Sequence, residues 1–129
     1  MISRRTLFAA LALSGMALAP PALADDMAFS ASGFEKARAS GKPVLVEVTA
    51  PWCPVCKAQK PILAELKGQA RFKDIATYTV DFDGQKDALR VLGVQKQSTL
   101  IVYKGGREVG RSTGETSKPA IEALLAKAL

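Results

Sequence analysis

The sequence predicts a single α/β domain built on a mixed β-sheet with helices on both faces. Short β-branched apolar runs alternate along the chain with segments whose apolar residues recur at helical spacing. A helical segment separates the first two strand candidates, and such a crossover makes a parallel pair. Gly105-Gly106 separates the last two strand candidates, as in an antiparallel hairpin. Strands of both directions are therefore expected in one sheet.

Residues 1–24 are expected to be a signal peptide and not part of this domain. Arg4 and Arg5 are followed by an apolar run over residues 7–19, which is shorter than the roughly 20 residues that span a bilayer. The small residues Ala22 and Ala24 form a cleavage site, so we expect cleavage after Ala24 and export to the periplasm. The arginine pair also fits a twin-arginine signal, and the choice between the two export routes stays open.

The remaining residues, 25–129, are enough for one domain with one modest core. Arg4 and Arg5 are two of the 18 basic residues, so the mature segment carries 16 basic and 12 acidic residues, a net charge of +4. These charges are scattered and form no basic run, so we expect no nucleic-acid partner.

The first half of the domain predicts one strand between two helices. We expect residues 25–33 to be a mobile lead-in and residues 34–40 to form a short helix that ends at Gly41. Residues 44–48 read as a strand buried on both faces, with Glu47 as its one polar residue. Residues 54–68 predict a helix that Pro61 should kink, because proline removes a helical hydrogen bond.

The second half predicts three more strands and two helices. Residues 75–82 read as a strand, and residues 86–92 as a short helix stopped by Gly93. Residues 99–103 and 107–112 are expected to be the two strands of the hairpin. Ser117 is a candidate N-cap for a final helix, with Pro119 near its start.

The two cysteines of the sequence, Cys53 and Cys56, lie three residues apart at the predicted start of a helix. Unpaired N–H groups and the helix dipole stabilise an anion there, which favours the thiolate of Cys53 as the nucleophile. Cys56 lies one turn further in, and we expect it to be more buried and to act as the resolving thiol. The spacing therefore predicts thiol-disulfide chemistry.

The same spacing also supplies half of many zinc sites. The sequence has no histidine and no third cysteine, so one chain cannot complete such a site from soft ligands. Two alternatives to redox chemistry remain: a metal-binding module in which two chains supply four thiolates, and a domain whose disulfide is inert and whose role is to bind a partner.

The segment Ala50-Pro51-Trp52-Cys53-Pro54-Val55-Cys56-Lys57 resembles the active-site segment of the thioredoxin family. Pro61 falls on the helix-kinking proline of that family, and the resemblance runs from about Pro43 to the C-terminus. It implies a thioredoxin-like fold for residues 25–129. Residues 39–46 also resemble the lead-in to the periplasmic thioredoxin-like domain of inner-membrane thiol-disulfide electron transporters.

The resemblance also implies roles for individual residues. Cys53, Cys56 and Glu47 match catalytic positions, with the carboxyl of Glu47 exchanging a proton with Cys56. A carboxyl on an apolar central strand should be desolvated, which raises its pKa and suits it to proton transfer. An edge position with the carboxylate in water is the alternative. We expect Trp52, Ser98 and Thr99 to be substrate-binding residues, and we expect no cofactor or metal.

Ser98 departs from the family, which has a cis-proline at this position. A cis bond before a residue other than proline costs about 2.5–4 kcal/mol, so we expect the Gln97-Ser98 bond to be trans. Serine also supplies an N–H and a hydroxyl, either of which can hydrogen-bond a thiolate or an incoming chain.

We predict a periplasmic thiol-disulfide oxidoreductase that works as a protein-disulfide reductase. Pro54-Val55 lacks the histidine that strong disulfide oxidants of the superfamily place between their cysteines, and Glu47 suits a proton-coupled reductase cycle. The expected partners are oxidised protein substrates and, as electron donor, a membrane thiol-disulfide electron transporter; we expect a monomer. The alternative within enzymes is a dithiol oxidase or isomerase.

Overall fold

The computed structural model describes residues 26–129. The predicted signal peptide, its cleavage after Ala24 and the twin-arginine motif lie outside the described residues. None of the described helices is both long enough and apolar enough to cross a membrane.

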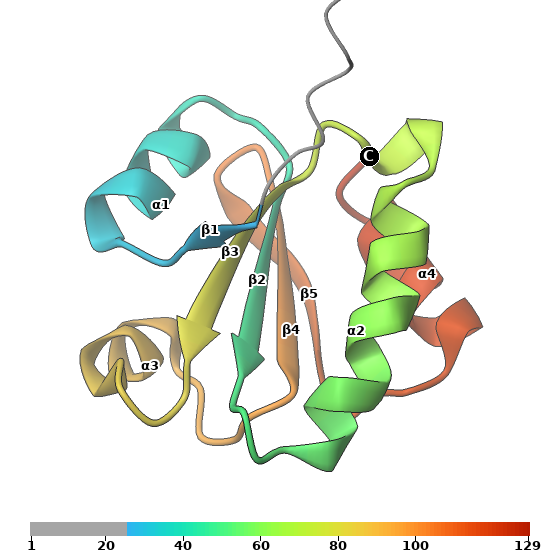
Figure 1. The fold of residues 1–129 in the computed structure, drawn as a ribbon. Coiled ribbons are helices and arrows are strands. Elements are labelled where there is room, and N and C mark those ends of the chain that lie inside the picture. The colour runs from blue at the N-terminus through green and yellow to red at the C-terminus, as the bar shows by residue number, and fades with distance from the viewer. Residues whose placement is uncertain (1–25) are drawn as a thin grey trace, which may run out of the picture.

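The described chain forms a five-stranded mixed sheet in the order β1-β3-β2-β4-β5 (Figure 1). β1 and β2 each pair with β3 in parallel, and β4 runs antiparallel to both β2 and β5. The strands are β1 (Met27–Ala28), β2 (Val44–Thr49), β3 (Ala76–Asp81), β4 (Thr99–Lys104) and β5 (Arg107–Thr113). The predicted mixed sheet is confirmed, and β2 lies at its centre.

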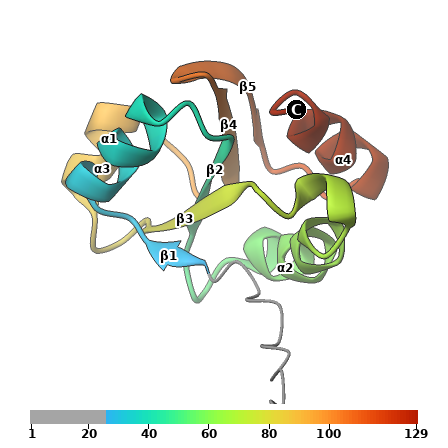
Figure 2. The same ribbon diagram turned by 90° about the horizontal axis from the view of Figure 1, so that it is seen from above.

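Helices cover both faces of the sheet, as predicted (Figure 2). Helices α1 and α3 lie on one face, and α2 and α4 lie on the other. The helices are α1 (Ala31–Ala39), α2 (Pro54–Lys67), α3 (Lys86–Leu92) and α4 (Lys118–Ala126), with a 3₁₀ turn η1 (Ala70–Phe72) after α2. Helix α2 continues past Pro61 to Lys67.

The alternation of side chains along β2 divides the core into two halves. Val44, Val46 and Val48 pack with side chains of α1 and α3. Leu45 points to the other face and packs with leucines of α2 and α4. A strand that is apolar on both sides is therefore buried on both sides, and Glu47 shares the face of Leu45.

The N-terminal part of the domain differs from the prediction. Residues 25–33 were expected to be a mobile lead-in, but β1 pairs with β3 and the side chain of Phe29 is buried. Helix α1 begins at Ala31, earlier than expected, because the Ser30 hydroxyl caps it by accepting a hydrogen bond from the Gly33 N–H at 3.1 Å. The prediction underestimated this segment because a two-residue strand leaves no periodic pattern.

Candidate active site

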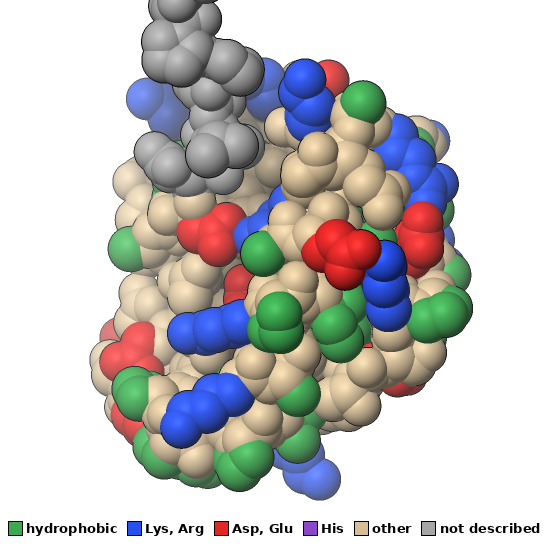
Figure 3. All heavy atoms as spheres, turned by 45° about the vertical axis from the view of Figure 1, so that its right-hand side comes forward, with side chains coloured by type: hydrophobic (Ala, Val, Ile, Leu, Met, Phe, Trp, Pro, Cys, Tyr) green, Lys and Arg blue, Asp and Glu red, His purple; other side chains and the backbone are tan. Residues whose placement is uncertain are grey.

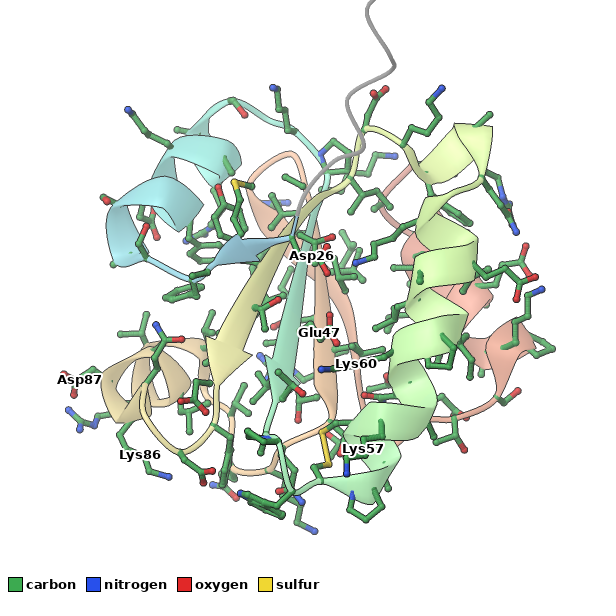
Figure 4. The ribbon with its side chains drawn as sticks, viewed as in Figure 1. Asp26, Glu47, Lys57, Lys60, Lys86 and Asp87 are labelled. Atoms are coloured by element: carbon green, nitrogen blue, oxygen red, sulfur yellow. A yellow bond between two sulfur atoms is a disulfide. The ribbon has the colours of Figure 1, made fainter. Side chains whose placement is uncertain are left out.

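The two cysteines lie where β2 leads into α2, at one end of the central strand. Cys53 is the N-cap residue of α2 with an extended backbone, and Pro54 follows at the first helical position, where the φ fixed by proline suits a helix. Cys53 and Cys56 form a disulfide with a Cα–Cα distance of 5.3 Å. The yellow bond at the lower end of α2 in Figure 4 marks it.

The backbone at this helix start stabilises a negative charge on Cys53. The Cys53 sulfur accepts a hydrogen bond from the Cys56 N–H at 3.1 Å, and it lies at the positive end of the α2 dipole. Both cysteines are equally buried, at 1% exposure each, so the expectation that Cys56 is the more buried one is wrong. The two sulfurs differ in their hydrogen bonding and not in their exposure.

Trp52 presents an apolar surface beside the disulfide. Its side chain is 54% exposed, its indole N–H donates to Asp83 Oδ2 at 2.7 Å, and its ring meets Phe82 edge-on. The sequence predicted Trp52 as a substrate-binding residue but did not identify Asp83 as its anchor. Nothing local in the sequence links Asp83 to a tryptophan 31 residues earlier.

Ser98 lies directly opposite Cys53, with its hydroxyl oxygen 3.6 Å from the Cys53 sulfur. No peptide bond among residues 26–129 is cis, so the expected trans bond before Ser98 is confirmed. Ser98 has a φ of 56°, the only positive φ of a residue other than glycine in the described chain. Its N–H donates to Val48 O at 2.8 Å, so of the two groups expected to face the thiols, only the hydroxyl does.

Thr99 is the first residue of β4, and its side chain is directed to structural contacts. Its hydroxyl donates to Lys96 O at 2.8 Å and lies 3.1 Å from the hydroxyl of Thr113 on β5. Thr99 is 2% exposed. The structure thus places Thr99 next to Ser98, and its role in substrate binding stays a prediction.

Glu47 is buried at the centre of the sheet and not at an edge. It pairs with Thr79 of β3 on one side and with Leu100 of β4 on the other, and it is 5% exposed. Burial raises the pKa of the Glu47 carboxyl, and nearby Asp26 adds to this rise, whereas the charges of Lys67 and Lys60 oppose it. The alternative of a solvated edge carboxylate is therefore wrong.

A cavity of about 310 Å³ lies beside Glu47, between α2 and the sheet. Figure 4 shows Lys60 extending from α2 towards β2, with Glu47 between Lys60 and Asp26 in that view. Asp26 forms an ion pair with Lys67 at 2.6 Å. The cavity is lined by Asp26, Glu47, Thr49, Lys60, Leu63, Ala64, Lys67 and Thr79. Glu47 thus lines a cavity together with two lysines of α2, which the sequence alone did not indicate.

The surface over α2 and α4 carries no patch of a single charge. Lys and Arg side chains are interspersed there with Asp and Glu (Figure 3), and Arg71–Glu122 and Lys118–Glu65 form ion pairs across this face. Within residues 26–129 no group of three or more Cys, Asp or Glu side chains is arranged to hold a metal ion.

A buried disulfide at a helix start, beside a central strand with a buried acid, defines a thiol-disulfide exchange protein. Residues 27–127 match the thioredoxin family model, and the chain belongs to the thioredoxin family. The chain is a thiol-disulfide oxidoreductase with Cys53 and Cys56 as its redox pair.

Individual relatives agree with this assignment. The chain is 41% identical to thioredoxin-2 of Saccharomyces cerevisiae over 74% of this chain and 90% of that protein. It is 32% identical to the thioredoxin of Alicyclobacillus acidocaldarius over 80% of this chain and 97% of that protein. Among solved structures, Trxlp from Edwardsiella tarda is 48% identical with a TM-score of 0.76, covering 78% of this chain and 98% of that one.

Proposed function

We propose that this protein is a periplasmic protein-disulfide reductase that acts through Cys53-Pro54-Val55-Cys56. The observation that carries the proposed exchange through Cys53 is the hydrogen bond from the Cys56 N–H to the Cys53 sulfur at the N-terminus of α2. This arrangement stabilises the thiolate of the reduced protein at the residue that must attack. The exposed ring of Trp52 offers an apolar surface to an unfolded or extended substrate chain.

The proposed cycle is two thiol-disulfide exchanges. The Cys53 thiolate attacks one sulfur of a substrate disulfide, which forms a mixed disulfide and releases the other substrate sulfur as a thiolate that takes up a proton. Cys56 then loses its proton and attacks the Cys53 sulfur of the mixed disulfide. The second substrate thiol leaves, and Cys53–Cys56 remains as a disulfide. The substrate gains two electrons and two protons, and the protein loses both.

Glu47 is proposed to accept the proton that Cys56 loses. Burial raises the pKa of this carboxyl towards that of a thiol, which favours proton exchange between them. The cavity lined by Lys60 and Thr49 connects the carboxyl to solvent, so the proton can leave the domain after each turnover. The Thr49 hydroxyl has no hydrogen-bond partner in the described part of the chain, which suits a polar path.

The reductant and the location belong to the same proposal. A dithiol consumed in each cycle must be regenerated, and we propose a membrane thiol-disulfide electron transporter as the donor. The resemblance of residues 39–46 to such a transporter's periplasmic domain and the signal-like residues 1–24 support this assignment. Oxidised proteins are the proposed substrates, and the protein is proposed to act as a monomer.

Insulin reduction and the reduction potential of the Cys53–Cys56 couple test the proposed function. A reductase should catalyse insulin reduction with dithiothreitol and have a potential nearer the roughly −270 mV of thioredoxin than the roughly −120 mV of a strong oxidant. The motif supports the low value because Pro54 and Val55 add no positive charge to the thiolate. A potential near the upper value would instead identify a dithiol oxidase.

Trapping of substrates tests the assignment of the two cysteines. Cys56→Ser should accumulate mixed disulfides through Cys53, because the resolving thiol is absent. Cys53→Ser should neither reduce insulin nor trap partners. Mass spectrometry of the trapped peptides identifies the linked cysteine. Partners attached through Cys56 in the Cys53→Ser variant would show that the roles are reversed.

A further inference from the structure

Gln59 is a buried amide in the first half of α2, one helical turn after Cys56. It is 1% exposed and lies on the same buried side of the helix as Cys56 and Leu63. Its side-chain NH₂ donates to Ser98 O at 3.2 Å and to Glu115 O at 2.8 Å. A buried amide without such partners would be costly, so these two bonds determine its position.

The contacts of Gln59 join three segments around the cysteines. Helix α2 is thereby tied to the loop before β4 through Ser98 and to the loop after β5 through Glu115. The Ser98 carbonyl also accepts from the Gly114 N–H at 3.0 Å, and the Ser98 N–H donates to Val48 O at 2.8 Å. Both backbone polar groups of Ser98 are therefore occupied, and its left-handed backbone is held from three sides.

The Ser98 hydroxyl is the one polar group of this residue that is free to act on the sulfur. Its hydrogen-bonding contact within residues 26–129 is with the Cys53 sulfur, at 3.6 Å. Neither a disulfide sulfur nor a thiolate carries a hydrogen, so in both states the hydroxyl donates and the sulfur accepts. A donor aimed at the attacking sulfur stabilises its anionic form more than its neutral form.

We propose that the Ser98 hydroxyl hydrogen-bonds the attacking sulfur of Cys53 and favours its thiolate, and that Gln59 is the positioning residue that holds Ser98 in place. This inference rests on the proposed function, since it concerns the thiolate that starts the cycle. The Cys53 thiolate then has two donors, the Cys56 N–H and the Ser98 hydroxyl. Gln59 does not contact the sulfur and acts through the Ser98 peptide.

Several charged groups on the surrounding elements also influence the Cys53 thiol, and the test must leave all of them unchanged. Figure 4 shows Lys57 beside the disulfide on α2. The charged residues on the elements around the cysteines include Glu47, Lys57, Lys60, Asp81, Asp83, Lys86, Lys96 and Glu115. Substitutions at Ser98 and Gln59 alter no formal charge, so a change in the pKa of Cys53 reports hydrogen bonding.

The test measures the pKa of the Cys53 thiol in a Cys56→Ser background, from thiolate absorbance and from the pH dependence of alkylation by iodoacetamide. Ser98→Gly removes the hydroxyl, and glycine adopts a φ of 56° without strain. We expect the pKa of Cys53 to rise by about one unit, as for loss of a hydrogen bond to a charged group. Ser98→Ala, which keeps the Cβ, should show the same rise.

Gln59→Met keeps the approximate volume of the side chain and removes its donor. We expect the pKa of Cys53 to rise in this variant too. In the Gln59→Met, Ser98→Gly double variant this pKa should rise no further than in Ser98→Gly alone, because both changes weaken the same hydrogen bond, from the Ser98 hydroxyl to the Cys53 sulfur. Ser112→Ala is the control. It removes a buried hydroxyl of β5 that has no hydrogen-bond partner in the described chain, and it should leave the pKa unchanged.

An unchanged pKa in Ser98→Gly and Ser98→Ala would overturn the role of the hydroxyl. An unchanged pKa in Gln59→Met, or a rise that adds to that of Ser98→Gly, would overturn the positioning role. If Gln59→Met does not fold, NMR of the wild type gives the answer. The side-chain amide protons of Gln59 should then exchange slowly with solvent, and their chemical shifts should change as Cys53 ionises. Rapid exchange with solvent would overturn the proposal.

Insulin reduction tests the proposed function separately from the pKa measurements that test this inference. Normal insulin reduction without these pKa shifts would refute the inference and leave the reductase assignment intact. Shifts in a protein that does not reduce insulin would refute the reductase and leave the hydrogen bonds in place.

Discussion

Hydrogen bonding, and not exposure, distinguishes the two cysteines at the scale of single residues. Cys53 and Cys56 are equally buried, but within residues 26–129 only the Cys53 sulfur lies within hydrogen-bonding distance of donors, the Cys56 N–H and the Ser98 hydroxyl. We expect a substrate sulfur to approach Cys53 from the side of the exposed Trp52. The half-exposed ring of Trp52 provides the apolar edge of that approach.

Glu47→Gln should raise stability at neutral pH and slow turnover. Because burial raises the pKa of Glu47 above its ordinary value of 4.5, the folded protein holds this proton more tightly than the unfolded chain does. The stability that protonated Glu47 contributes is complete below about pH 4.5 and is lost as pH rises through the raised pKa. Glutamine does not titrate, so the variant should gain stability relative to the wild type across that window.

The turnover of Glu47→Gln should fall by about tenfold or more if the carboxyl accepts the proton of Cys56. Urea denaturation at several pH values measures the gain in stability, and insulin reduction across neutral pH measures the loss of turnover. Thr79→Val, which changes another residue lining the same cavity without removing a carboxyl, serves as the control. Parallel pH profiles of activity for Glu47→Gln and the wild type would argue against a proton-transfer role.

Ser98→Pro should destabilise the domain by about 3 kcal/mol or more. Proline holds φ near −65°, whereas Ser98 has a φ of 56°. Proline would also remove the N–H that donates to Val48 O at the end of β2. The free energy of unfolding in urea measures the effect. Ser98→Gly is the control because it keeps both the φ and the N–H. An equal loss of unfolding free energy in Ser98→Gly would show that the missing hydroxyl causes the effect.

At the scale of elements, the junction of β2 and α2 carries the redox pair, and its position depends on how α2 docks. Leu63 and Leu66 anchor the helix in the core cluster that it shares with β2, β4 and α4. The N-terminal half of α2, with Cys56 and Gln59 on the same side, is thereby held against the Ser98 loop. The packing of one helix thus determines the geometry of the site.

Leu66→Ala should lower the free energy of unfolding by about 2–5 kcal/mol, because Leu66 is fully buried and its removal leaves a cavity. Its neighbour on the same helix is a matched control. Glu65 is largely exposed and pairs with Lys118, so Glu65→Ala should cost less than about 1 kcal/mol. Thermal or urea denaturation compares the two, and similar losses would contradict the docking of α2 through its leucines.

At the scale of the whole molecule, the cysteines lie at one end of the sheet and the C-terminus at the other (Figures 1 and 4). Helices on both faces leave the end with the disulfide free to meet a substrate. The N-terminal strand β1 lies against β3 at the edge of the sheet. The domain therefore presents a single reactive end, which suits alternate contact with an oxidised substrate and with a reductant.

Export should release a mature protein that begins at Asp25. Expression of the full chain in a Gram-negative host, followed by N-terminal sequencing of the periplasmic fraction, measures this directly. Replacing Arg4 and Arg5 by lysine keeps the positive charge and should reduce export only if the twin-arginine route is used. Retention of the unprocessed chain in the cytoplasm would contradict both the cleavage site and the periplasmic assignment.

The sequence by itself determined the fold class, the order of the elements from α1 to α4 and the redox pair. These features depend on local signals: apolar periodicity, glycine and proline at turns, and two cysteines at a helix start. The short spacing from Cys53 to Cys56 at a helix start is enough to indicate thiol-disulfide chemistry. The burial of Glu47 was also predictable, because a lone acid within an apolar run must share the burial of its strand.

Only the tertiary structure decided which side chains meet the sulfurs. Gln59 reaches residues 39 and 56 positions further along the chain, and Asp83 anchors a tryptophan 31 positions earlier. The lysines around Glu47 come from α2, and Asp26, the partner of Lys67, precedes β1. Such contacts depend on how helices dock on a sheet, and side-chain docking leaves no periodic signal in the sequence. The equal burial of the two cysteines has the same cause, since the Ser98 loop covers Cys53 from across the fold.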